Sequence, residues 1–325
     1  MDSILNNERF AETFQQLAGV GLNPRRHTAA NALEHSEAVA ARAVALARAN
    51  GCTESEARLL ENLGRAHDIG KVSGTARPER SLEVLRACGI EEPQLLALVK
   101  WHDTSLPWYQ AQTRGQPPSD KAWRRLASEV DLRLLAMFMV ADRVDAPPGW
   151  RRNAPTVWFH GEARDRGLVP ALTLDLPDHP SEISAGGALV RHHEGTREAL
   201  VIRVRAEGYE LPKGGIEWDE LPADAAVRET CEEAGIEVGG APGLEVGREL
   251  AHVDYVVGEG AARHGKRVRY FRLAATGPVP FGALPGRTRE RRWIGREDVP
   301  TIPLINEALR PVLVAALEGS GAGVG

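Results

Sequence analysis

The sequence predicts two domains, an all-helical one followed by one of mixed α and β structure. Its 325 residues exceed what one typical core accommodates. Residues 5–146 carry Leu and Ala at helical spacing, whereas from Ser184 onward short β-rich runs alternate with Gly and charged turns. A Pro-rich stretch separates the two patterns, with one short helix expected near residues 162–166. The expected parts are a helical domain over 1–150, a linker packed on a domain over 151–183, a mixed domain over 184–318 and a disordered tail over 319–325.

The composition limits the classes of function. With 42% hydrophobic and 26% charged residues the chain suits soluble globular folding, and its formal net charge of -5 argues against a nonspecific polyanion binder. Cys52, Cys88 and Cys231 are too far apart for a disulfide framework or a Cys-rich zinc site. The sequence shows no signal peptide and no apolar run of about 18 residues. We therefore expect a cytoplasmic protein without a membrane span, and the oligomeric state stays open.

Four helical segments of the first half each place a potential metal ligand on an otherwise apolar stripe. These ligands are His35, His67, His102 and Asp142, and Asp68 directly follows His67. A single His on an apolar face is more often a hydrogen-bonded core residue, and Asp142 beside Arg143 can be half of an ion pair. Burying all of these groups together is costly unless a divalent cation offsets the charge. Imidazole and carboxylate ligands hold such an ion and leave positions open for water and phosphate.

The order of these residues carries a resemblance. A His, a later His-Asp pair within HDIGK (67–71) and a distant Asp within ADRVD (141–145) resemble the HD superfamily of metal-dependent phosphohydrolases over about residues 25–146. The resemblance implies that His35, His67, Asp68 and Asp142 bind a divalent ion such as Mn²⁺, Fe²⁺, Co²⁺ or Ni²⁺. It also implies hydrolysis of a phosphomonoester or a cyclic phosphodiester, with Asp68 in a catalytic role.

The surroundings of this pattern leave some roles open. Dinuclear members of the family often have two adjacent histidines where this chain reads Trp101-His102-Asp103, which favours a mononuclear site or an incomplete second one. His102 is therefore a second-metal ligand, a general acid or a phosphate contact. Lys71 either steadies a substrate phosphate or is a surface lysine after a helix end. His27 and Arg26 either flank the mouth of the site or are plain surface residues.

The second half contains a box of glutamates. Residues 214–236 read GGIEWDELPADAAVRETCEEAGI, in which Pro222 suits the first turn of a helix and Gly235 its C-terminal cap. Helical spacing puts Arg228 on one face with three carboxylates, those of Glu229, Glu232 and Glu233. Such crowding needs compensation, and hard carboxylate oxygens favour Mg²⁺ or Mn²⁺. A lone acidic face is usually just solvated, but the preceding glycine loop and Glu220 argue for a site.

This box resembles the Nudix hydrolase signature at nearly every defined position. The resemblance implies metal ligation by Glu229, Glu232 and Glu233, with a further ligand from the Gly214 carbonyl. It implies that Arg228 and Glu220 orient the loop and the helix. The flanking β-rich runs and the closing apolar segment fit an α/β (α+β) Nudix fold, a mixed sheet between helices, over about residues 184–318. Thr230 departs from the pattern, because an aliphatic residue usually stands there, and this affects packing rather than metal binding.

Three features near the box bear on the substrate. The Pro212-Lys213-Gly214 entry is shared with Nudix proteins that act on dinucleoside polyphosphates, inositol pyrophosphates or capped RNA ends. Lys213 is expected near the polyphosphate, with a plain loop lysine as the alternative. Glu290 is either an additional metal ligand or base, or one half of a surface salt bridge. A basic cluster either receives phosphates or an RNA strand, or is a solvated strand edge; it consists of Arg287, Arg289, Arg291 and Arg292.

The sequence thus predicts a bifunctional metal-dependent phosphohydrolase. The Nudix domain is expected to hydrolyse a diphosphate linkage in a nucleotide, a dinucleoside polyphosphate or a capped RNA end, and the HD domain a phosphate ester. Two alternatives stay open: a nucleotide-sensing protein in which one domain regulates the other, and a factor that processes or repairs RNA ends. The sequence does not choose among the substrates, and it does not tell whether the two activities are sequential.

Overall fold

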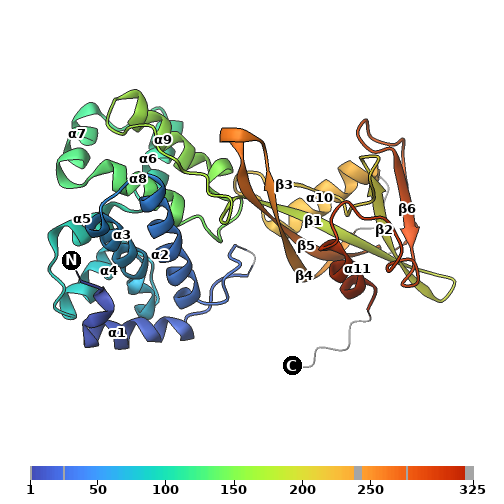
Figure 1. Cartoon of the computed structure of the whole chain (residues 1–325), viewed down its shortest axis with the longest axis horizontal. Helices are drawn as coiled ribbons and strands as arrows, with labels where there is room; N and C mark the ends of the chain where they lie inside the picture. The colour runs from blue at the N-terminus through green and yellow to red at the C-terminus, as the bar shows by residue number, and fades with distance from the viewer. Residues whose placement is uncertain (1, 25, 238–243, 276, 319–325) are drawn as a thin grey trace. The chain divides into compact units, whose positions relative to one another are not determined.

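The computed structural model describes residues 2–24, 26–237, 244–275 and 277–318. The predicted disordered tail over 319–325 lies outside these residues. The chain divides into two compact units, and each is described by itself (Figure 1). The helical unit comprises Met1–Glu182 and Val256–Gly265, and the mixed unit comprises Ile183–Tyr255 and Lys266–Gly325.

The helical unit is built almost entirely from α-helices. They are α1 (Glu8–Gln15), α2 (Ala32–Ala49), α3 (Glu54–Ala66), α4 (Pro78–Ala87), α5 (Pro93–Trp101), α6 (Ser105–Thr113), α7 (Asp120–Glu129), α8 (Leu132–Ala141) and α9 (Ala154–Asp165). The Asn31 side chain caps α2 by accepting from the Glu34 N–H, and Thr53 with Glu56 forms a capping box at α3. These caps mark the start of α2, which carries His35, and of α3, which His67 directly follows.

The helices α2 and α3 approach very closely. A Cβ added at Gly64 of α3 would lie 2.4 Å from the Ala40 Cα of α2, so only glycine permits this crossing. Helix α8 is buried on all sides, because every residue of it except Arg133 lies in the core. A helix that is apolar all round belongs in the middle of a bundle. Its C-terminal end therefore delivers Asp142 to the interior of the unit.

The Pro-rich stretch contains a longer helix than the sequence predicts. Helix α9 begins at Ala154, well before the expected position near residue 162. Pro155 interrupts a helical pattern when it stands inside one, but here it occupies the first turn, where its missing N–H costs nothing. Asn153 caps the helix through Thr156 N–H, and Phe159 packs on Trp123, with ring centroids 5.1 Å apart.

The mixed unit contains one sheet with a helix on each face. Its strands are β1 (Pro180–His193), β2 (Thr196–Arg203), β3 (Lys213–Gly215), β4 (Leu244–Val257), β5 (His264–Ala275) and β6 (Glu290–Ile294), and its helices are α10 (Pro222–Ala234) and α11 (Leu309–Leu317). The strand order is β4-β5-β1-β2-β6, and β3 pairs with β1 so that Gly214 lies opposite Ala185. Strand β1 is antiparallel to both β2 and β3.

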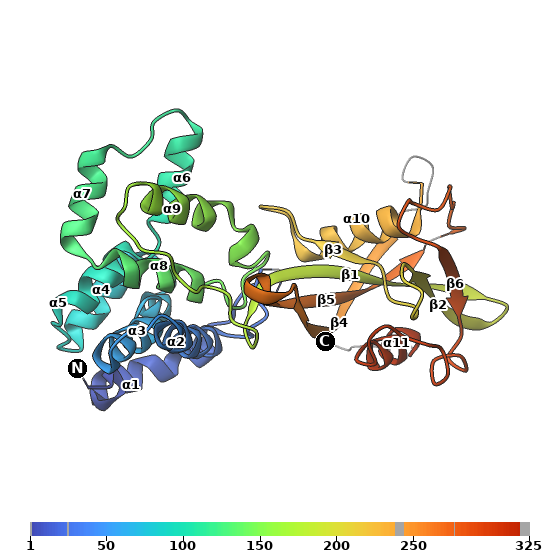
Figure 2. The same cartoon turned by 45° about the horizontal axis from the view of Figure 1, so that its top comes forward.

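Alternating side chains divide the sheet between two cores. On β2, Leu200 and Ile202 pack with residues of α10, whereas Ala199 and Val201 pack with residues of α11. The two helices accordingly cover opposite faces, as Figure 2 shows. The predicted fold class, a helical domain followed by a sheet between helices, is confirmed. Among the described residues, no helix combines the length and the apolar character that a membrane crossing needs.

Two candidate metal centres

The helical unit brings its four predicted ligands together. His35 comes from the first half of α2, His67 and Asp68 follow α3, and Asp142 follows α8. The Asp142 Oδ1 lies 3.3 Å from the Nε2 of His35 and 3.3 Å from the Nε2 of His67. The Asp68 Oδ2 lies 3.4 Å from the same His67 nitrogen. Three separate helices therefore direct two imidazoles and two carboxylates at one point.

The His67 ring is oriented for ligation. Its Nδ1 lies 2.9 Å from the Gly64 carbonyl, so this nitrogen donates to the backbone and Nε2 presents its lone pair to the carboxylates. The Nε2 atom is buried without a hydrogen-bond partner. Its distances to Asp68 and Asp142 are long for hydrogen bonds, but two ligands about 2.1 Å from one ion lie roughly 3 Å apart. The donor set thus fits a divalent cation.

The charges of the cluster favour the same conclusion. Burial by itself lowers the pKa of His67, but Asp68 and Asp142 outweigh it and raise that pKa to about 10. Burial raises the pKa of Asp142, yet Arg143, His35 and His67 hold it well below its usual range. The carboxylates are therefore ionised, and the cluster attracts positive charge. A metal ion supplies that charge in place of a proton.

Two further predicted residues border this centre. The Lys71 ammonium lies 2.6 Å from the Oδ2 of Asp68, one of the predicted ligands. His102 is buried, its Nδ1 lies 2.7 Å from the Val99 carbonyl, and its ring centroid is 5.3 Å from that of His67. Its Nε2 is therefore the nitrogen with a lone pair to offer, in the same tautomer as His67.

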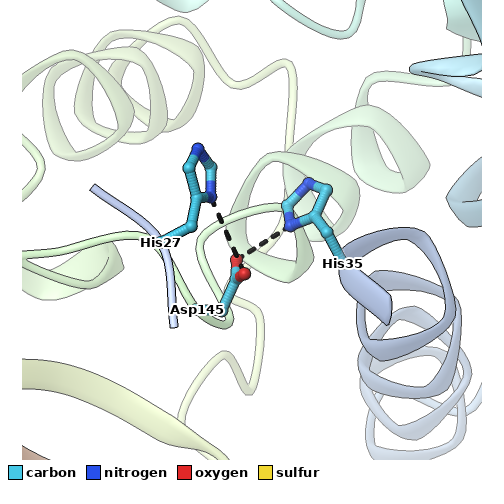
Figure 3. Close-up of side chains that lie close together, drawn as sticks. All are labelled: His27, His35 and Asp145. Carbon is cyan, nitrogen blue, oxygen red and sulfur yellow. Dashed lines mark hydrogen bonds and ion pairs between the residues drawn. The ribbon is translucent and has the colours of Figure 1, made fainter. Parts of the chain in front are cut away.

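The structure brings Asp145 to this centre and places His27, for which the sequence left both the mouth of the site and the plain surface open. Asp145 lies beside His35, with its Oδ1 2.8 Å from the His35 Nδ1, and His27 lies on the other side of the carboxylate, 3.7 Å from its Oδ2 (Figure 3). These three side chains are close enough to form a second group of potential ligands. Asp145 closes the ADRVD segment, but it follows the end of α8, so helical periodicity does not place it on the inward stripe of that helix. The His27 side chain is partly buried, at 23% exposure.

In the mixed unit, Arg228 organises the glutamate box. Its Nε donates to the Glu220 Oε1 at 2.8 Å, its Nη1 to the Glu229 Oε1 at 2.7 Å and its Nη2 to the Gly215 carbonyl at 2.8 Å. The Glu232 Oε2 lies 3.3 Å from the same Nη1. One planar guanidinium therefore connects the loop before α10 to the carboxylates on the helix, which requires the fixed fork of an arginine.

The remaining contacts position the carboxylates against β3. The Glu233 Oε2 accepts from the Lys213 N–H at 2.8 Å. A Cβ added at Gly214 would lie 1.9 Å from the Glu229 Oε2, so the glycine leaves the space that this carboxylate occupies. Burial, with help from Glu210 and Glu229, raises the pKa of Glu233. A dense set of carboxylates with one compensating arginine fits a hard divalent ion such as Mg²⁺ or Mn²⁺.

Other predicted residues near the box are occupied by protein partners. The Lys213 ammonium pairs with the buried carboxylate of Glu210. Glu290 accepts from the Tyr209 hydroxyl at 2.7 Å and pairs with Arg203 at 2.5 Å. The Thr230 hydroxyl donates to the Ala226 carbonyl at 2.6 Å, so the polar departure from the aliphatic pattern is satisfied within the helix.

Two arginines of the predicted basic cluster have protein partners. Arg291 donates to the carbonyls of Ala234 and Gly282, both at 2.7 Å, and so caps the C-terminal end of α10. Arg292 pairs with Asp298 at 3.5 Å. The sequence spacing of strand arginines did not distinguish a helix cap from a phosphate-binding surface.

Comparison with known proteins adds two matches to family models. The model of the HD domain matches residues 32–146, and the model of the NUDIX domain matches residues 181–315. No curated protein matches the chain.

Similar solved structures align with part of the chain. An Ap4A hydrolase of C. elegans, in a binary complex, is 21% identical over 41% of this chain and 93% of its own, with a TM-score of 0.32. The MutT protein from Methanosarcina mazei Go1 is 20% identical over 41% of this chain and 89% of its own, with a TM-score of 0.32. The NUDIX domain of Shewanella oneidensis NrtR, complexed with ADP ribose, is 18% identical over 40% and 82%, with a TM-score of 0.31.

The family matches coincide with the two sequence motifs and with the clusters of side chains that those motifs form. The chain therefore carries an HD domain followed by a Nudix domain.

Proposed function

We propose that the chain is a bifunctional metal-dependent phosphohydrolase. The Nudix domain cleaves a diphosphate linkage in a nucleotide or dinucleoside polyphosphate, and the HD domain hydrolyses a phosphomonoester or a cyclic phosphodiester. The observation that carries this proposal is the meeting of His35, His67, Asp68 and Asp142 at one place in the helical unit. In the mixed unit, the Arg228 guanidinium lies against both Glu229 and Glu232, which supports the second site. Complete ligand sets in both domains support catalysis by both, rather than a role for one of them as a binding sensor.

In the HD domain, His35, His67, Asp68 and Asp142 would hold the ion, with Mn²⁺, Fe²⁺, Co²⁺ or Ni²⁺ as candidates. A bound divalent ion lowers the pKa of water and polarises a phosphoryl group. The protein supplies the orientation: the Gly64 carbonyl fixes the His67 ring, and Lys71 offsets the negative charge of Asp68. Lys71 also places a cation where a substrate phosphate would approach the centre.

In the Nudix domain, Glu229, Glu232 and Glu233 would hold Mg²⁺ or Mn²⁺. The Arg228 guanidinium keeps Glu229 in place, and the Lys213 N–H keeps Glu233 in place. Because most of these contacts lie between one helix and the loop that precedes it, the carboxylates are preorganised before substrate arrives. Arg291 caps α10 and Arg292 pairs with Asp298, so neither is left to bind a phosphate backbone. This favours a nucleotide substrate over an RNA strand.

The test uses the full chain and two variants, Glu232→Gln and the double variant His67→Ala with Asp68→Ala. Each is assayed with Mg²⁺ or Mn²⁺ against nucleoside diphosphate compounds, dinucleoside polyphosphates, phosphomonoesters, cyclic phosphodiesters and capped RNA. A metal contributes several kcal/mol to the transition state, so we expect each variant to lose about 10²–10³-fold in one activity and to keep the other. Full diphosphate cleavage by Glu232→Gln would refute the Nudix assignment, and full ester hydrolysis by the double variant would refute the HD assignment.

A further inference from the structure

The His35 ring lies between two carboxylates. On one side, its Nε2 is 3.3 Å from the Asp142 Oδ1, where the proposed metal centre lies. On the other side, its Nδ1 is 2.8 Å from the Asp145 Oδ1 (Figure 3). Both His35 and Asp145 are buried, at 2% and 4% exposure, so solvent does not replace either contact.

The chemistry of imidazole assigns different tasks to the two sides. A neutral imidazole has one lone pair and one N–H, so a ring that offers Nε2 to a metal carries its proton on Nδ1. A buried N–H without an acceptor costs about 1–3 kcal/mol. Asp145 is the acceptor for that proton. We propose that Asp145 is a positioning residue of the HD metal centre, which fixes the tautomer and the rotation of the His35 ring; this inference rests on the proposed metal-dependent function.

Asp145 is itself held from several directions. Its Oδ2 accepts from the Ala29 N–H at 3.3 Å, and its backbone carbonyl accepts from the Thr28 N–H at 3.2 Å. The His27 Nδ1 lies 3.7 Å from the same Oδ2. The carboxylate therefore connects the segment before α2 to the segment after α8. Contacts other than the one to His35 therefore hold this carboxylate in place. A group can orient a neighbouring ring only if it is itself held.

The side chains of His27, His35 and Asp145 could instead bind an ion of their own. The geometry favours positioning, because the Nδ1–Oδ1 distance of 2.8 Å is that of a charge-assisted hydrogen bond. An ion at Nδ1 would also need the His35 ring to ligate through both nitrogens. The two possibilities differ in the number of bound ions, which is therefore one of the quantities to measure.

The decisive variant is Asp145→Asn in the full chain. The carboxylate accepts with both oxygens, from His35 and from Ala29, whereas an amide has only one acceptor oxygen. Either His35 or Ala29 therefore loses its acceptor without a change in side-chain size. Asp175→Asn is the matched control, because this carboxylate of the helical unit pairs with Arg151 and has no contact with His35.

The measurement is a Mn²⁺ titration followed by electron paramagnetic resonance, which gives the number and the affinity of the bound ions. The class of sites lost in His67→Ala identifies the HD centre. Loss of a partner that orients a metal-ligating His typically costs about 10–100-fold in affinity. We expect Asp145→Asn to weaken that class by this factor with no change in ion number, and Asp175→Asn to leave it unchanged. In the Zn²⁺-loaded chain, ¹⁵N spectra should show the His35 proton on Nδ1.

Each contrary result has a distinct meaning. A His35 proton on Nε2 overturns the positioning role. Unchanged affinity in both Asp145→Asn and Asp145→Ala also overturns it, because the alanine offers no acceptor to His35. Loss of one ion with the other affinities unchanged makes Asp145 a ligand and also overturns it. If His67→Ala removes no class of sites, the proposed HD centre itself fails. Far-UV circular dichroism checks folding, and if Asp145→Asn does not fold, Asp145→Glu is titrated instead, because its longer carboxylate shifts the ring and should weaken the same class.

Discussion

The two candidate metal centres of this chain are assembled over very different distances in sequence. In the Nudix domain, one helix carries Glu229, Glu232 and Glu233, while Gly214 lies in the preceding strand β3 and Glu220 in the loop between them. In the HD domain, three helices supply the ligands, and His35 lies 110 residues from the Asp145 that contacts it. The first centre depends on the local conformation of one segment, whereas the second depends on how helices pack.

One glycine near each centre illustrates this difference. Gly214 leaves room for a carboxylate, because a Cβ there would lie 1.9 Å from the Glu229 Oε2. Gly64 leaves room for a helix, because a Cβ there would lie 2.4 Å from the Ala40 Cα. The same added methyl group should therefore disturb a ligand in one domain and a helix crossing in the other.

Gly214→Ala should impair the Nudix domain through its ligand. Displacing Glu229 by about 1 Å misplaces the metal, which should reduce diphosphate cleavage by about 10²-fold. The rate of cleavage in saturating Mg²⁺ measures the effect, and HD activity should not change. Gly161→Ala is the control, because no atom lies within 4 Å of the added Cβ. An unimpaired Gly214→Ala enzyme would show that Glu229 need not occupy its observed position.

Gly64→Ala should impair the HD domain through its packing. Forcing a methyl group against the backbone of α2 costs about 3 kcal/mol, and the better helix propensity of Ala returns about 1 kcal/mol. We expect a net loss of about 2 kcal/mol in the free energy of unfolding, together with weaker Mn²⁺ binding at the HD centre. Urea unfolding and Mn²⁺ titration test this. If stability fell while Mn²⁺ affinity stayed the same, the centre would not depend on the crossing of α2 and α3.

Acid should destabilise the helical unit through His160. Burial lowers the pKa of this imidazole from its ordinary value to about 4. Because the unfolded chain binds the proton more readily, the neutral ring favours folding at pH 7, and this contribution is lost as the pH falls toward 4. We expect the free energy of unfolding to fall by about 1–2 kcal/mol more in the native chain than in His160→Gln between pH 7 and pH 5. Urea unfolding at both pH values gives the comparison, and equal losses would contradict it.

Thr230→Val should have the smallest effect. The hydroxyl donates to the Ala226 carbonyl one turn earlier in α10, and the side chain is buried. Restoring the aliphatic residue typical of the family should change stability by less than about 1 kcal/mol and leave cleavage unaltered. Thermal unfolding and a cleavage assay suffice as measurements. A tenfold loss of cleavage would indicate that the hydroxyl has a role at the site.

Most of the candidate sites could be read from the sequence, for reasons that differ between the domains. The glutamate box has its residues at helical spacing within one segment, so local periodicity alone puts its carboxylates on one face. The HD ligands could be named because each lies at an inward position of its own helix, although nothing local shows that the helices converge. Their roles, like those of Glu290 and Lys71, stay predictions that the variants above address.

The misjudged features share a physical cause. Arg291 belongs to the predicted basic cluster, for which the sequence offers either a phosphate-binding surface or a solvated strand edge, but it caps α10 through carbonyls more than fifty residues away in sequence. Helix α9 is longer than the short helix predicted near residues 162–166, and it accommodates Pro155 because that residue lies in its first turn. In both cases the role of the residue depended on a hydrogen-bond partner or on a helix boundary, which the residue type alone does not reveal.

The sequence by itself determined the two domain families, the helical and mixed fold classes and the identity of most candidate ligands, because these follow from periodicity and from spacing within short segments. The tertiary structure alone decided which carboxylate contacts the Nδ1 of His35, which carboxylate pairs with Lys71 and what Arg291 caps. Such contacts join residues on separate elements, and their geometry depends on helix crossings and strand register. Local chain conformation does not encode these, so they appear only when the whole core is packed.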